Sequence, residues 1–146
     1  MPLALNDRKN IRPLNGAVVR PFEAGAAVQI GDAVYVNFAN DRVLPARANA
    51  DATTYAIGIV VSVEGHMPST SAQTGQTVGV CVEGAVAGFT GMDDAKGIVW
   101  LSAATAGAVT QTKPTGASNR VFSVGRAIRS DVLFVSPQAT EAVAGV

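Results

Sequence analysis

The chain has 146 residues, of which 48% are hydrophobic and only 15% are charged. This composition excludes an intrinsically disordered chain, and the length is enough for one domain with a sizeable core. Eleven basic and eleven acidic residues give zero formal net charge, which argues against the basic surface that nucleic-acid binding requires. The low charge also favours a surface that is partly covered by a protein partner.

The first 15 residues, MPLALNDRKNIRPLN, follow neither a helix nor a strand period, and two prolines interrupt them. We therefore predict an extended N-terminal arm over residues 1–15. Four basic residues fall within the first twenty of the chain: Arg8, Lys9, Arg12 and Arg20. Two interpretations stay open for this basic terminus, namely a solvated arm and a segment that docks on an acidic partner.

The rest of the chain is rich in valine and isoleucine, and glycines and other turn residues divide it at short intervals. Residues of this type in this pattern indicate strands. The predicted strands cover 17–20, 26–30, 33–38, 43–47, 56–64, 77–83, 86–89, 98–101, 108–112, 121–128 and 132–135. We expect an all-β fold, a compact antiparallel β-barrel or sandwich of about 8–10 short strands.

This β domain is predicted to span residues 16–137, with residues 138–146 as a C-terminal tail. Within it, residues 65–76 form a polar loop and residues 90–96 the one predicted helical turn. Two strands show a clear period of two, which predicts one inward face for each. These faces are Ile57, Ile59, Val61 and Val63 in the first, and Val78, Val80 and Val82 in the second. Val34, Val36 and Phe38 are likewise expected to share one face.

The stretch GIVWLSAATAGAVTQTKP, from Gly97 to Pro114, contains the one tryptophan of the chain. We predict a hairpin of residues 98–101 against 108–112, in which Gly107 supplies the backbone angle that starts the second strand. Trp100 is expected to pack in or beside the barrel, at a contact between subunits.

The sequence offers little for catalysis. His66 lies two residues from Glu64 in the polar loop, and we interpret it as a solvent-facing side chain rather than a catalytic base. One histidine and one cysteine exclude a zinc site, and Asp93 and Asp94 are too few ligands for calcium. Cys81 is expected to be a small buried hydrophobe. We predict no enzymatic activity, no metal and no cofactor.

No apolar run approaches the roughly 18 residues of a membrane span, and the N-terminus lacks the hydrophobic region of a signal peptide. We therefore expect a chain that is made in the cytoplasm and has no membrane partner.

Five stretches occur in a recognisable order: GAVAGF (84–89), GIVWLS (97–102), GAVT (107–110), VGRA (124–127) and LFVSP (133–137). Together with GDAVYV (31–36) and AIGIVVS (56–62), they resemble the head decoration, or cement, proteins of tailed bacteriophages. Similar strings occur in phage head-fibre and some tail-fibre modules. The resemblance covers roughly residues 16–137.

The resemblance implies a trimeric β-barrel-like protein that binds major capsid protein on the outer surface of the phage head and stabilises the shell. It also implies that the N-terminal arm becomes ordered on the capsid. The arm residues expected to make this contact are Leu3, Leu5, Arg8, Lys9, Ile11, Arg12 and Leu14. The alternative is a fibre or receptor-binding module that contacts a bacterial surface glycan, although residues 65–76 contain no aromatic side chain for such a site.

Overall fold

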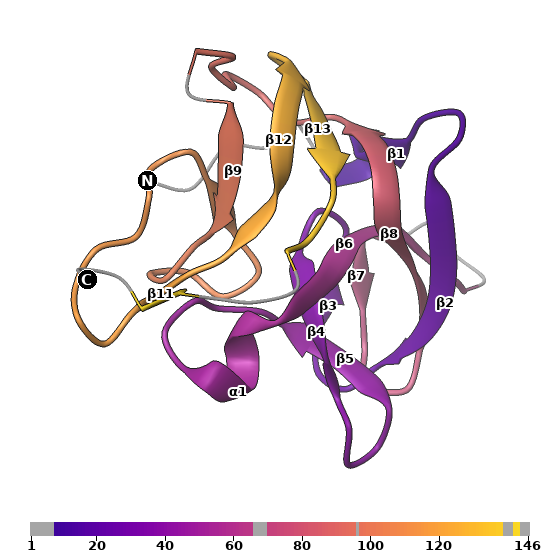
Figure 1. The fold of residues 1–146 in the computed structure, drawn as a ribbon. Helices are drawn as coiled ribbons and strands as arrows, with labels where there is room; N and C mark the ends of the chain where they lie inside the picture. Colours follow the sequence, from indigo (N-terminus) through magenta and orange to yellow (C-terminus); the bar gives the residue numbers. More distant parts are fainter. Residues whose placement is uncertain (1–7, 66–69, 96, 139–141, 144–146) are drawn as a thin grey trace.

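A computed structural model describes residues 8–65, 70–95, 97–138 and 142–143 of the chain. The expected fold class is confirmed: 49% of the residues lie in strands and 5% in helices, around a closed five-stranded β-barrel with additional strands (Figure 1). Leu3, Leu5 and His66 lie outside the described residues.

Five strands close the barrel in the order β2, β5, β4, β6 and β8. Their bounds are Val18–Ala24 for β2, Ala33–Asn37 for β4, Arg42–Pro45 for β5, Ala56–Val63 for β6 and Thr77–Ala87 for β8. The ring closes because β8 pairs with both β2 and β6. All of these pairings are antiparallel except that of β2 with β5, which is parallel.

The far half of β8 extends beyond the barrel and carries further strands. Along one edge the order continues through β13 (Val132–Val135), β12 (Ser123–Arg129), β9 (Ile98–Leu101) and β10 (Val109–Thr110). β1 (Arg12–Pro13) also pairs with this half of β8. Two small ribbons complete the structure, β3 (Val28–Gln29) with β7 (Ser71–Ala72) and β11 (Arg120–Val121) with β14 (Ala142–Val143). β8 is therefore shared by the barrel and the outer sheet (Figure 1).

The predicted helical turn at residues 90–96 is wrong for the described part of that segment, which holds only a turn at Asp94–Ala95. There the Asp93 carboxylate accepts a hydrogen bond from the Ala95 N–H, a local contact that favours a turn over a helix. The short helices lie elsewhere, at η1 (Arg8–Asn10) and α1 (Asp51–Thr54). The Thr54 hydroxyl, at the end of α1, donates to the Ala50 carbonyl.

The predicted alternation along β6 is wrong in both halves of the strand. Ile59, Val60 and Val61 are all buried in succession, whereas Ile57 and Val63 are only half-buried. The register of β6 against β8 shifts between Val60 and Ser62. Such an irregularity breaks the period of two, because it turns the following side chains toward the other face.

Phe38 also departs from its expected face, since its side chain is 90% exposed while Val34 is fully buried. β4 ends at Asn37, so Phe38 already belongs to the turn that leads into β5. The core itself is continuous between the barrel and the outer sheet. Its largest fully buried side chains are Phe89, Phe122, Ile59, Leu101 and Leu133.

Candidate functional site

The described residues contain no cluster of three or more His, Cys, Asp or Glu side chains that could hold a metal ion. Across the same part of the chain, no helix is long and apolar enough to cross a membrane. Glu64 is exposed just after β6, and His66, which we interpret as a solvent-facing side chain, lies outside the described residues.

Cys81 lies in the middle of β8 and is completely buried. Burial raises the pKa of its thiol, and the S–H group donates to the Glu83 carbonyl oxygen at 3.5 Å. The buried position agrees with the prediction of a small core side chain.

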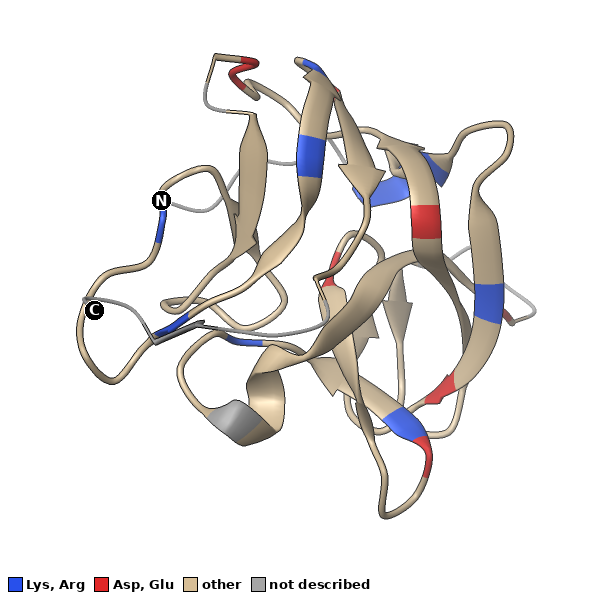
Figure 2. Ribbon diagram, in the orientation of Figure 1, with Lys and Arg blue, Asp and Glu red and all other residues tan. Residues whose placement is uncertain are grey.

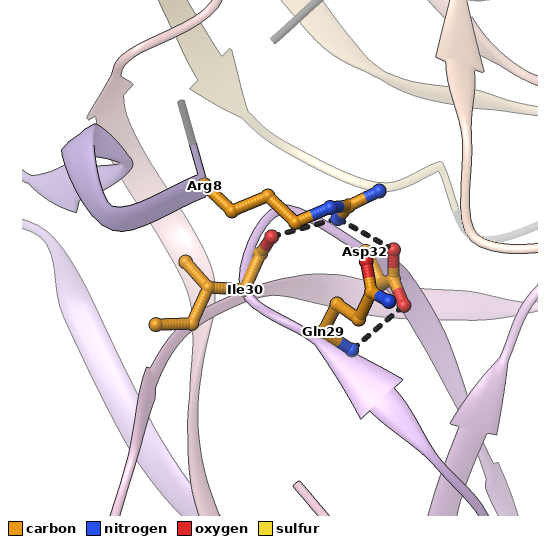
Figure 3. Close-up of polar contacts among 4 residues, drawn as sticks. All are labelled: Arg8, Gln29, Ile30 and Asp32. Atoms are coloured by element: carbon orange, nitrogen blue, oxygen red, sulfur yellow. Dashed lines mark hydrogen bonds and ion pairs between the residues drawn. The ribbon is translucent and has the colours of Figure 1, made fainter. Parts of the chain in front are cut away.

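The N-terminal segment is tied to the barrel by Arg8. The Nη1 atom of Arg8 donates to the Ile30 carbonyl at 2.8 Å and lies 3.1 Å from Asp32 Oδ1 (Figure 3). The other carboxylate oxygen of Asp32 accepts the Gln29 N–H at 2.9 Å. Arg8, the first described residue, is therefore linked to the turn between β3 and β4. Its hydrogen bond to Asp32 is charged, and such bonds are stronger than neutral ones.

Asp32 is an unusual residue for this position because its side chain is only 13% exposed. Burial raises the pKa of its carboxyl group, while the Gln29 N–H and the Arg8 guanidinium lower it to a smaller extent. The ionised carboxylate thus has a desolvation cost that its two partners offset only in part.

The remaining expected arm residues divide into an inner and an outer set. Ile11 is 3% exposed and belongs to the core, and the Leu14 N–H donates to the Ala85 carbonyl at 2.9 Å. Lys9 and Arg12 are exposed on the outside. Residues 8–14 are therefore part of the domain. The prediction of an extended arm then concerns residues 1–7, which lie outside the described residues.

The predicted hairpin is confirmed next to its turn, where Val109 pairs with Leu101 and Thr110 with Trp100, but its second strand ends at Thr110 rather than at residue 112. Gly107 has a φ of 80°, as expected for the turn. Val99 and Leu101 point into the core, so Trp100 points the other way and is only half-buried. Lys113 Nζ lies 5.8 Å from the centre of its ring, a cation–π distance. Trp100 lies beside the core rather than in it.

One surface feature was missed by the sequence analysis, a groove of about 630 Å³ between α1 and the β4–β5 hairpin. We call it the aromatic groove, and its lining residues are Tyr35, Val36, Asn37, Phe38, Ala52, Tyr55 and Ile57. The lining comes from two separate stretches of the chain, residues 35–38 and 52–57. The available signal in the sequence was the position of Phe38, two residues before the predicted Asn40–Asp41 turn.

Charged residues are dispersed over the molecule, with basic and acidic positions interspersed along the strands and loops in the view of Figure 2. One exposed ion pair, Arg42 Nε to Glu23 Oε2 at 3.5 Å, joins β5 to β2. A scan of protein-family models and a search of curated proteins found no match to this chain.

Proposed function

We propose that this protein is a structural component of a bacteriophage head, a decoration protein that binds the outer surface of the capsid and stabilises it. One observation carries the proposal. The five ordered stretches that resemble decoration proteins fall on β8, β9, β10, β12 and β13, which are neighbours in a single sheet. A likeness spread along the sequence thus corresponds to one continuous part of the fold, which supports a shared architecture.

In this proposal the capsid contact is made by residues 1–7 together with the exposed side chains beside them. Leu3 and Leu5 would supply apolar area, and Lys9 and Arg12 would supply charged contacts to acidic groups of the major capsid protein. Arg8 and Ile11 hold the base of this segment on the domain instead. This attachment fixes where the segment leaves the domain, which lowers the entropic cost of docking.

We further propose that the working form is a homotrimer in which Trp100 contributes to the contact between subunits. A half-buried tryptophan on an outer strand is a common type of interface residue. The zero net charge limits repulsion between copies packed closely on a shell. Three copies would also bind with avidity, so that each N-terminal segment need contribute only modestly.

The second candidate function is a fibre or receptor-binding module for a bacterial surface glycan. The aromatic groove favours this alternative, because Tyr35 and Tyr55 offer ring faces and hydroxyl groups. The two functions differ in their ligand: major capsid protein in one case, a polysaccharide in the other.

Co-sedimentation with purified, expanded shells of major capsid protein tests the proposal. We expect the full chain to sediment with the shells as a trimer, and a variant lacking residues 2–7 to fold but stay in the supernatant. His66→Ala serves as the control and should bind like the wild type. Retention on the host's surface polysaccharide with no shell binding would instead establish the fibre function.

A further inference from the structure

The aromatic groove combines a protruding side chain with a hollow beside it. Phe38, at the tip of the β4–β5 hairpin, is 90% exposed, and Tyr55 on the opposite wall is 47% exposed. Water-exposed phenyl rings are costly, and aromatic residues dominate the energetics of protein contacts. A cover for this face would therefore be stabilising.

Both walls of the groove are held in place before anything binds. The ring of Tyr55 packs edge-on against the buried Phe122, with centroids 5.9 Å apart and an interplanar angle of 81°. On the other side, the Asn37 carbonyl accepts the Asp41 N–H at 2.8 Å, and the Asn37 side chain accepts the Ala39 N–H at 3.0 Å. These bonds close the turn around Phe38, so little conformational freedom would be lost on association.

The charges point to the kind of partner. None of the groove's lining residues carries a charge, which disfavours an ionic ligand. The neighbouring hollow shares Val36 with the groove and is bordered by Glu23 and Asp41, and Arg42 pairs with Glu23 next to it. Because Arg42 and Glu23 neutralise each other beside the groove, an apolar partner surface such as a second copy's Phe38 suits this face better than a charged one.

We infer that this face binds a second copy of the same chain, with Phe38 of each copy entering the aromatic groove of the other. A protrusion and a hollow side by side on one patch complement themselves across a two-fold axis. A volume of about 630 Å³ is ample for one phenyl ring. The contact pairs two single chains, and it pairs two trimers when its two-fold axis crosses the trimer axis at a right angle. It does not depend on the proposed capsid binding.

Sedimentation velocity over a wide concentration range tests this inference. For the wild type we expect the mass to double as concentration rises. Phe38→Ser should weaken the doubling at least tenfold, and Ala52→Trp, which fills the hollow but leaves Phe38 in place, should weaken it as well. Ile128→Ser is the matched control, because Ile128 is an exposed apolar residue on β12, 49% accessible, and this variant should double like the wild type.

Three results would overturn the inference. One is a mass that stays constant over the whole range. Another is doubling that survives both Phe38→Ser and Ala52→Trp. The third is a groove that takes a glycan, seen as polysaccharide retention lost in Phe38→Ser while the mass is unchanged. Shell binding by Phe38→Ser is measured separately and reports on the proposed function alone.

Discussion

Arg8 and Asp32, 24 residues apart in the chain, form an ion pair of 3.1 Å that fastens the N-terminal segment to the turn between β3 and β4 (Figure 3). Among the described residues, Arg8→Ala would leave a mostly buried carboxylate with the Gln29 N–H as its one remaining hydrogen-bond partner. We expect the free energy of unfolding, measured by urea denaturation, to fall by about 1–3 kcal/mol. Arg12→Ala, at an exposed position nearby, should change it by less than about 0.5 kcal/mol. Equal effects of the two substitutions would contradict this role for Arg8.

The same carboxyl group predicts a pH dependence of stability. The pKa of Asp32 in the folded protein lies above its ordinary value of 3.8, chiefly because of burial. Between these two values the folded state holds more protons than the unfolded state, so this group's contribution to stability falls as pH rises through that window. Asp32→Asn removes the titration. The free energy of unfolding of Asp32→Asn relative to the wild type should therefore increase from pH 3 upward, at constant ionic strength, and level off once Asp32 is ionised. A flat or decreasing difference would mean that the pKa is not raised.

The closure of the barrel predicts an intolerant position at Gly58 on β6. A Cβ atom placed there would lie 2.0 Å from the Cys81 carbonyl oxygen, and a backbone atom of the central strand cannot move aside without disturbing its pairings. Gly58→Ala should cost at least about 2–3 kcal/mol or prevent folding, as severe overpacking does. Gly65→Ala is the matched control, since the nearest atom to its Cβ is the end of the Gln76 side chain at 3.4 Å. Thermal unfolding of both variants tests the prediction, and an unperturbed Gly58→Ala would rule out this close approach.

Cys81 provides a chemical measure of the same core. Its thiol is buried and its pKa is raised, so both access and the thiolate fraction are low at neutral pH. We expect labelling by a thiol-specific disulfide reagent to be at least about 100-fold slower in the native protein than in urea, because reaction requires an opening of β8. Rapid labelling in native buffer would place Cys81 at an accessible site.

Much of the fold was predictable because local pattern and tertiary environment agree. The bounds predicted for β9 and β13 match the structure, since each is a short β-branched run between turn residues. Agreement fails where barrel closure changes the register, as between Val60 and Ser62. It also fails at residues 77–89, where two predicted strands are one strand, β8, that continues through Gly84 to Ala87.

The contact surfaces were less predictable. Ile11 and Arg8 were assigned to an arm because their segment has no period, and their partners in the core and at Asp32 are distant in sequence. The aromatic groove likewise depends on how α1 packs beside β4. No local pattern specifies such contacts, since they arise only when the barrel closes.

In the proposed function, this protein binds a phage head and strengthens it. The most direct measurement is the temperature at which DNA-filled heads lacking the protein release their DNA, with and without the purified chain added back. We predict that saturating protein raises this temperature by several degrees, and that the variant lacking residues 2–7 does not. An unchanged release temperature, with no protein bound to the heads, would contradict the account.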